Sequence, residues 1–420
     1  MYALCDVSAM YASCEKVFDP SIRKKPVVVL TNNDGCICAT CPVARKMGIG
    51  KSFVPYFTVK DELAAMGVVI RSSNYELYAD LSQRLMDTCA RFAPDHHVYS
   101  IDECFLYFGS YIPDAGWQAH AKTIRRTVWK EVRLPIGVGI GPTPTLAKAA
   151  NHASKRIEGF NGVAVIDNNA VRRRVLKQMA VVDIWGIGRR LARRLNEMGI
   201  ETAWQLAESK PALMRKHFSV LVESTVYELN GITKLSWDDV RSPKQQIYST
   251  RSFGERVTDK SILRQALLSH VTIAASKLRR QQGLVKTIQV FVSNSPHDRD
   301  SFYRKSVTHQ FLTPTSDTSV IANTVSGLVE NLYRQGVHFY KCGVGLIELV
   351  DAAQYQADLF SLSTDNALLM QCMDSINARY GRNTVHIAGQ GTTPQYTMKR
   401  EFLSPQYTTR LEGLPRILCD

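Results

Sequence analysis

The sequence has no run of about 18 consecutive apolar residues, the length that a membrane-spanning helix needs. The residues after Met1 also lack the basic region and the long apolar stretch of a secretory signal peptide. No internal repeat is visible. The absence of a membrane-spanning run and of a signal peptide predicts a cytoplasmic protein that is not held in a membrane.

Acidic residues are fewer than basic ones. The chain has 38 Asp and Glu against 52 Lys and Arg, which gives a net charge of +14. The excess is concentrated in residues 241–350, with 15 basic side chains against 7 acidic ones. Such a balance favours an acidic partner, most often a nucleic acid, although a basic surface can also serve solubility alone.

Cysteine is present in ordinary number, with ten residues in 420, and thiols in the cytosol stay reduced. Three of them cluster at Cys36, Cys38 and Cys41, which resembles half of a zinc or iron–sulfur site. No second Cys or His pair follows at metal-ligand spacing. We therefore interpret the cluster as buried or incidental thiols.

A chain of 420 residues is too long for one compact core, so about three or four units are expected. Strands and helices alternate through residues 2–165, as is typical of an α+β unit. Residues 166–235 have the pattern of helices, and residues 236–246 are a candidate linker. Residues 247–350 follow the order strand, helix, strand, strand, helix, strand.

Three carboxylates stand beside apolar strands. Asp6 ends the first strand, and Asp102 and Glu103 occupy the turn of a predicted hairpin. Carboxylates there are costly unless something compensates them. Two Mg²⁺ ions on these three side chains and the carbonyl of Val7 would activate a hydroxyl and stabilise a leaving pyrophosphate. Taken alone, the carboxylates also fit ordinary turns that face water.

A wider set of motifs resembles the Y-family, or translesion, DNA polymerases. Asp6 with Tyr11 matches the first motif of that family, and Ser100-Ile101-Asp102-Glu103 the second. Further matches are Gly137-Val138-Gly139-Ile140-Gly141, Leu146-Ala147-Lys148 and Asn151-His152-Ala153-Ser154-Lys155. Several segments are similar to the UmuC branch: Thr31–Cys36, Ser72–Asp80, Ser252–Arg256 and Ala388–Gly391. The resemblance covers essentially the whole chain.

The resemblance implies a multidomain α+β fold, the right-hand polymerase. Its parts would be a palm at residues 1–24 and 72–165, small fingers at 25–71, a helical thumb at 166–235, a little finger at 247–350 and a C-terminal extension at 351–420. It also implies that Asp6, Asp102 and Glu103 are catalytic. Tyr11 would be the steric gate, whose ring excludes a ribose 2′-hydroxyl by shape. Arg45 and Lys155 would bind the triphosphate.

Candidate DNA contacts fall in two regions. Gly186-Ile187-Gly188 resembles the turn of a helix–hairpin–helix, in which backbone N–H groups bind a phosphate, with Arg189 and Arg190 beside it. The other candidates lie in the expected little finger: Arg251, Arg256, Lys277, Arg279, Arg280 and Lys286. Contacts of this kind bind phosphates and carry little sequence information.

Protein partners are expected at the C-terminal end. Gln356-Ala357-Asp358-Leu359-Phe360 resembles the bacterial sliding-clamp-binding peptide, in which Gln356, Leu359 and Phe360 would make the anchoring contacts. Residues 361–420 resemble the extension specific to UmuC, which implies that a UmuD′-like dimer and RecA are partners.

The expected function is error-prone translesion synthesis in the SOS response, on primer–template DNA with dNTPs, near the nucleoid. The alternative is a non-catalytic, UmuC-like regulator of replication. A third class, a cyclase with a similar two-metal site, would not explain the basic region.

Three departures from the pattern of the Y-family polymerases bear on the choice between an enzyme and a regulator. Proline stands at Pro42, where some relatives have a tyrosine, and at Pro144, where Lys is frequent, while Ser52 begins an altered turn.

Overall fold

The computed structural model describes residues 1–50, 53–235, 237, 244–298, 301–356, 365–392 and 396–414. It forms two compact units: Met1–Ser242 with Glu401–Asp420, and Pro243–Arg400. The predicted linker thus separates them, and the predicted C-terminal extension is divided between them. Among the described residues, no helix combines the length and apolar character needed to cross a membrane.

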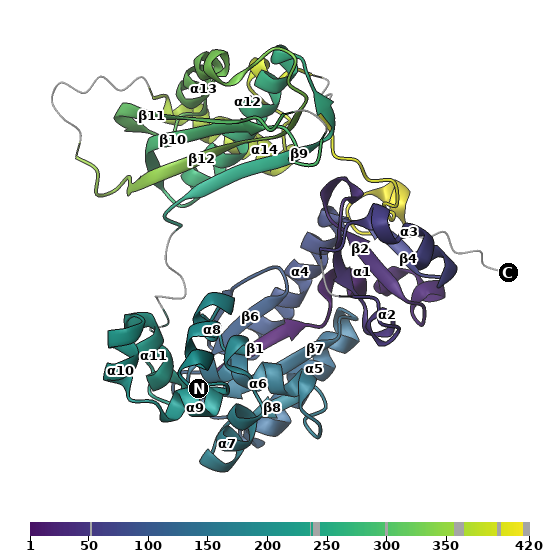
Figure 1. Ribbon diagram of the computed structural model, residues 1–420, viewed down its shortest axis with the longest axis vertical. Helices are drawn as coiled ribbons and strands as arrows, with labels where there is room; N and C mark the ends of the chain where they lie inside the picture. The colour runs from purple at the N-terminus through teal and green to yellow at the C-terminus, as the bar shows by residue number, and fades with distance from the viewer. Residues whose placement is uncertain are drawn as a thin grey trace. The chain divides into compact units, whose positions relative to one another are not determined.

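The first unit is built on a five-stranded sheet with the order β5-β6-β1-β7-β8 (Figure 1). The central strand β1 (Tyr2–Val7) is antiparallel to both neighbours, β6 (Glu103–Tyr107) and β7 (Ile136–Gly141). The sheet's outer strands are β5 (Asp95–Val98) and β8 (Val163–Val165). The predicted hairpin is therefore confirmed with one correction: Asp102 lies in the turn, whereas Glu103 is the first residue of β6 because it pairs with Asp6 of β1.

Helix α6 (Pro144–Arg156) packs closely on one face of this sheet. The glycines of β7 make this approach possible, because a Cβ on Gly139 would clash with the backbone of Ala147 and Asn151. The amide of Asn151 then ties the helix to the sheet, donating hydrogen bonds to the carbonyls of Leu4 (3.0 Å) and Gly137 (2.8 Å). The alternating glycines thus serve to bring α6 against the strands.

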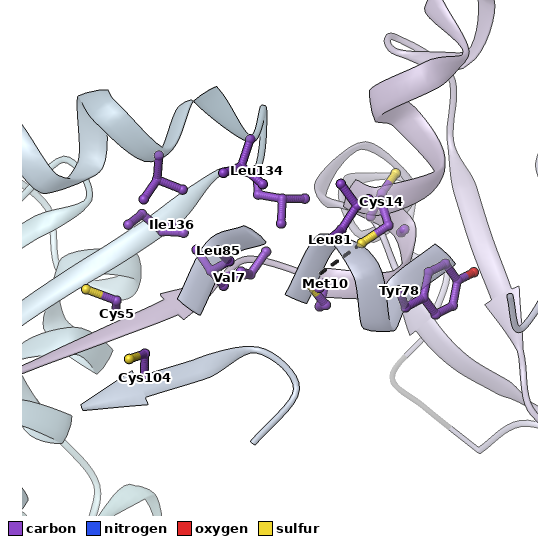
Figure 2. Packing of buried hydrophobic residues seen from close by; sticks show 14 of the residues in the cluster. Cys5, Val7, Met10, Cys14, Tyr78, Leu81, Leu85, Cys104, Leu134 and Ile136 are labelled. Atoms are coloured by element: carbon purple, nitrogen blue, oxygen red, sulfur yellow. Dashed lines mark hydrogen bonds between the residues drawn. The ribbon is translucent and has the colours of Figure 1, made fainter. Parts of the chain in front are cut away.

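The opposite face of the sheet carries the apolar core of the unit. Alternate side chains of a strand point to opposite faces, so Ala3, Cys5 and Val7 enter this core. Helices α4 (Tyr75–Ala90) and α5 (Gly116–Glu131) pack there, and Figure 2 shows Leu81 and Leu85 of α4 in the same cluster. Helix α1 (Met10–Phe18) joins it through Met10 and Cys14.

Residues 27–72 form a smaller lobe around a three-stranded sheet with the order β3-β2-β4. Its strands are β3 (Ile37–Thr40), β2 (Val27–Leu30) and β4 (Val69–Ser72), and its helices are α2 (Pro42–Lys46) and α3 (Tyr56–Ala65). The clustered cysteines have structural contacts here. The Cys41 sulfur accepts from the N–H of Ala44 at the start of α2, and the Cys38 thiol donates to the carbonyl of Val29.

The helical region that follows confirms the pattern predicted for residues 166–235. Its helices are α7 (Asn169–Lys177), α8 (Arg189–Glu197), α9 (Ala203–Glu208), α10 (Pro211–His217) and α11 (Val220–Leu229). Glu228 of α11 is fully buried and accepts from the backbone N–H groups of Thr145, Lys234 and Leu235. This carboxylate joins α11 to the start of α6.

The second unit has a four-stranded antiparallel sheet with the order β11-β10-β12-β9. Along the chain its elements are β9 (Ile247–Val257), α12 (Lys260–Arg280), β10 (Gly283–Ser293), β11 (Arg304–Thr315), α13 (Thr318–Leu332) and β12 (Phe339–Asp351). This is the predicted order of strands and helices. Helix α14 (Ala367–Tyr380) follows, and its Asp374 pairs with Arg279 of α12.

We expect Gly139→Ala to destabilise the first unit by about 3 kcal/mol, because the added methyl group forces α6 away from β7. Thermal unfolding of the full chain measures this. Gly327→Ala in α13 is the control, since its Cβ meets nothing within 4 Å and alanine favours a helix. Equal effects of the two substitutions would show that the glycine of β7 is not required for close packing.

The second unit should lose stability in mild acid through His270. Burial and the nearby cations Arg251 and Lys277 lower the pKa of His270 from 6.5 to about 4. The unfolded chain therefore binds this proton first, and stability falls as the pH drops below 6.5, by about 2 kcal/mol between pH 7 and pH 5. Hydrogen exchange of β10 amides measures the fall. His270→Gln, which cannot titrate, should remove most of it, and an unchanged pH dependence would contradict this assignment.

Candidate active site and nucleic-acid contacts

Two of the predicted metal ligands lie directly opposite each other in the sheet. Asp6 of β1 is the cross-strand partner of Glu103 of β6. The same register pairs Leu4 with Phe105 and Tyr2 with Tyr107, so all these side chains share one face. That face is covered by α6, as the contact of Leu4 and Phe105 with Ala147 shows. The fold thus brings together carboxylates almost a hundred residues apart.

Helix α6 supplies a lysine to each of these two carboxylates. The Nζ of Lys155 lies 2.6 Å from Oδ1 of Asp6, and the Nζ of Lys148 lies 3.0 Å from Oε1 of Glu103. Burial raises the pKa of Asp6, and the charges of Glu103 and Asp102 act in the same direction, whereas Lys155 opposes the rise. Neighbouring carboxylates of this kind stabilise an added cation.

Asp102 occupies the turn between β5 and β6. Its carbonyl accepts from the N–H of Val7 (3.0 Å), and its Oδ1 accepts from the hydroxyl of Ser100 (2.6 Å). Ser100 also accepts from the N–H groups of Asp102 and Glu103, so one hydroxyl organises the turn. Within the described ranges, no three His, Cys, Asp or Glu side chains are grouped tightly enough to hold a metal. Asp6 and Glu103 are instead each paired with a different lysine.

Tyr11 lies on α1, near the carboxylates. Burial raises the pKa of Tyr11 to about 12, and the nearby charges that add to this rise include Asp102. Its ring stacks on Tyr78 of α4, with centroids 4.6 Å apart, and meets Tyr75 edge-on. The ring is thereby held between fixed neighbours, as a residue acting by its shape requires.

Arg45 lies exposed on the last turn of α2, and the ion pairs of Asp6 and Glu103 are made by other residues. The departures at Pro42 and Pro144 have a local explanation. Each proline begins a helix, α2 or α6, where the lost N–H is not needed and the fixed φ suits the first turn. Neither proline therefore disrupts its helix. Ser52 lies outside the described residues.

The Gly186-Ile187-Gly188 turn leads directly into α8. Gly186 has a φ of +85°, in the left-handed region that favours glycine, and Gly188 is the N-terminal cap of α8. Arg189 and Arg190 follow as exposed residues at the helix start. Before the turn, the only regular element from residue 178 onward is a single 3-10 turn at Val181–Asp183. The first helical segment of the predicted motif is therefore short.

The candidate DNA contacts of the second unit differ in availability. Arg251 is exposed on β9. Arg256 makes a two-pronged ion pair with Asp298, with both N–O distances 2.7 Å, and lies over the ring of Tyr340. Arg279 donates to Asp374, Ser316 and Thr318, so its role is to hold α12 to neighbouring segments. In the clamp-like peptide, Leu359 and Phe360 lie outside the described residues; Gln356 is described.

Two residues of the site were not among the predicted contacts. Lys148, seven residues before Lys155, lies two helical turns away on the same face of α6, a spacing that sequence reading can detect. Its ammonium also lies 4.4 Å from the ring centroid of Tyr99. Ser100 precedes Asp102 by two residues, as is typical of a serine that organises a turn.

Comparison with known proteins adds independent evidence. Models of the impB/mucB/samB family and of its C-terminal domain match residues 5–152 and 244–359, and a domain of unknown function matches residues 367–417. Protein UmuC of Salmonella typhimurium is 42% identical over 99% of this chain and 100% of its own. Protein MucB of Escherichia coli is 37% identical over 99% of each chain.

Solved structures give the fold. A Y-family DNA polymerase chimera of Dbh and Dpo4 is similar, with a TM-score of 0.64 and 21% identity, over 83% of this chain and 99% of the other. The insertion ternary complex of Dbh DNA polymerase has a TM-score of 0.55 and 20% identity, with the same coverage. This chain therefore has the multidomain fold of the Y-family polymerases, and it belongs to the impB/mucB/samB family.

Proposed function

We propose that this chain is a DNA-directed DNA polymerase that extends primers opposite damaged template bases, in the SOS response to DNA damage. The observation that carries the proposal is the direct opposition of Asp6 and Glu103, with Asp102 in the adjoining turn. Three carboxylates at one end of a sheet suit nucleotidyl transfer, and the family relationship supports the same chemistry. A non-catalytic regulator has no need of this arrangement.

Family membership implies dependence on a divalent metal, and the donor set suits one. Asp6, Asp102 and Glu103 offer hard oxygen ligands, which Mg²⁺ prefers. The ammonium groups of two lysines lie against Asp6 and Glu103 and compensate their like charges. This end of the sheet therefore attracts cations, as a metal site requires. We infer that these three residues, with the carbonyl of Val7, hold two Mg²⁺ ions. These ions would supply activation of the primer hydroxyl and stabilisation of the pyrophosphate.

The protein's own residues would perform the remaining steps. The ammonium of Lys155 would leave Asp6 and bind an oxygen of the triphosphate instead, and Arg45 would bring a second positive charge to the triphosphate. Ser100 would hold Asp102 through its hydroxyl. The ring of Tyr11, fixed by Tyr78, would occupy the space that a ribose 2′-hydroxyl needs. The absence of a recognisable exonuclease set in the sequence agrees with low fidelity.

The remaining regions would hold the DNA and the partner proteins. Backbone N–H groups at Gly186 and Gly188, with Arg189 and Arg190, would bind one phosphate region and Arg251 another. Arg256 would first have to leave Asp298. A UmuD′-like dimer, RecA and, through Gln356, Leu359 and Phe360, the sliding clamp are the proposed protein partners. The enzyme would work in the cytoplasm, near the nucleoid.

We expect Asp102→Asn to reduce primer extension with Mg²⁺ by roughly 10³-fold, because the substitution removes a charged metal ligand worth about 4 kcal/mol in the transition state. Single-turnover extension on a lesion template, with the partner proteins present, measures this. DNA binding, measured separately, should be retained. Asp114→Asn, an exposed carboxylate of the same unit, is the control. Extension by Asp102→Asn at the wild-type rate would remove Asp102 from the metal site.

Tyr11→Ala should lower discrimination against ribonucleotides by at least about tenfold, since the alanine leaves room for the 2′-hydroxyl. The measurement is the ratio of kcat/KM for a dNTP to that for the matching rNTP. Tyr11→Phe keeps the ring and should keep the ratio, because the exclusion depends on shape. Unchanged discrimination in Tyr11→Ala would show that another residue excludes the ribose.

A further inference from the structure

The C-terminal segment at residues 401–407 belongs to the first unit, although the 158 residues before it form the second. Figure 1 shows this yellow segment beside α3 and β4 of the small lobe. The domain of unknown function that matches residues 367–417 therefore contributes to both units. The way the segment is attached shows what it does for the first unit.

Backbone hydrogen bonds attach the start of the segment to the end of β4. The N–H of Ser72 donates to the carbonyl of Phe402 (3.0 Å), and the N–H of Phe402 donates to the Ser72 hydroxyl (2.9 Å). Asp34 accepts from that hydroxyl (2.6 Å) and from the N–H of Glu401 (2.7 Å). The segment thus provides the hydrogen-bond acceptor for the backbone N–H of Ser72, at the end of an edge strand.

Aromatic contacts and a buried amide hold the rest of the segment. The ring of Tyr407 stacks on Phe18 of α1, with centroids 5.0 Å apart. The amide of Asn74, which is fully buried, donates to the carbonyl (3.1 Å) and the hydroxyl (2.9 Å) of Ser404 and to the carbonyl of Pro405 (3.3 Å). These contacts place the Ser404 hydroxyl, itself 5% exposed, inside the unit.

The Ser404 hydroxyl completes the environment of a buried carboxylate. It donates to Oε1 of Glu15 (3.2 Å), the same oxygen that accepts from the hydroxyl of Tyr78 (2.6 Å). The other oxygen, Oε2, has no hydrogen-bond partner among the described residues and lies 3.6 Å from Nε of Arg71. Among the described residues, two hydrogen bonds and the ion pair with Arg71 therefore hold Glu15, and one of the hydrogen bonds comes from the C-terminal segment.

Tyr78 connects this carboxylate to the active site. Its hydroxyl is held by Glu15, while its ring stacks on Tyr11 at 4.6 Å with an interplanar angle of 15°. Glu15 and Tyr11 also lie four residues apart on α1, on neighbouring turns. A shift of Glu15 would reach the Tyr11 ring both through the helix and through the stacked ring.

We propose that residues 401–407 are positioning residues for Tyr11, and that Ser404, acting through Glu15 and Tyr78, sets how strictly the enzyme excludes ribonucleotides. The inference rests on the proposed function and on the role of Tyr11 as the gate. It assigns part of the domain of unknown function to the nucleotide site. The segment would act by limiting the movement of one aromatic ring.

Ser404→Ala is the sharpest test, because the backbone carbonyls that accept from Asn74 remain and the segment stays attached. We expect the dNTP-to-rNTP ratio of kcat/KM to fall by about threefold to tenfold, the range that corresponds to one net hydrogen bond. Ser249→Ala is the matched control. It also removes a buried hydroxyl, one that is hydrogen-bonded to His270 in the second unit, and it should leave the ratio unchanged.

Combining Ser404→Ala with Tyr11→Ala distinguishes positioning of the Tyr11 ring from general damage to the fold. In Tyr11→Ala, the further change Ser404→Ala should have no additional effect on the ratio, because the gate through which it acts is absent. An equal fall in both backgrounds would overturn the proposal. An unchanged ratio in Ser404→Ala would also overturn it, provided that Tyr11→Ala alone has lost discrimination.

Hydrogen exchange gives a readout that does not need polymerase activity. In the full chain, Ser404→Ala should increase amide exchange in α1 and in the first turns of α4, and Ser249→Ala should not. If the wild-type chain extends no primer, the proposed function fails, and this measurement still decides whether the segment holds α1. Unchanged exchange in α1 would overturn the inference whatever the activity.

Discussion

The structure depends on one electrostatic constraint: Asp6 and Glu103 face each other across adjacent strands, on the same side of the sheet. Like charges in that position repel, and burial adds to the cost by raising the pKa of Asp6. Positive charge must therefore be close. The fold meets this need with Lys155 and Lys148, both carried by a single helix that lies over the carboxylates.

The position of that helix explains features of the sequence that otherwise seem unrelated. The glycines of β7 leave room for the backbone of α6, and Asn151 ties the helix to β1 and β7. Pro144 begins α6, and the carboxylate of Glu228 accepts a hydrogen bond from the N–H of Thr145 in the first turn of α6. The helical region is thereby joined to the same helix. A substitution at any of these places would move the lysines relative to the carboxylates.

Much of the first unit could be predicted from sequence, because local patterns determine its elements. The alternation of strands and helices through residues 2–165, the turn at Asp102 and the helical pattern of residues 166–235 all appear in the structure. The order of elements in the second unit followed from the same signals. Lys148 could also have been found, since it lies two helical turns from Lys155 on one face.

What sequence reading missed are contacts between distant parts of the chain. No local pattern indicates that Asp298 engages Arg256, that Asp374 engages Arg279, or that Ser404 returns to Glu15. A surface arginine and a paired one look alike in a sequence, and so do a free tail and an attached one. These pairings depend on the tertiary fold, which brings together side chains separated by 42 to 389 residues.

The central claim is that the opposed carboxylates bind the catalytic metal ions. It is tested most directly by electron paramagnetic resonance of bound Mn²⁺, used in place of Mg²⁺, in the full chain with primer–template DNA and a non-hydrolysable dNTP. The account predicts two bound Mn²⁺ ions in the wild type and weaker binding in Asp6→Asn. Equal Mn²⁺ binding by the wild type and Asp6→Asn would contradict it.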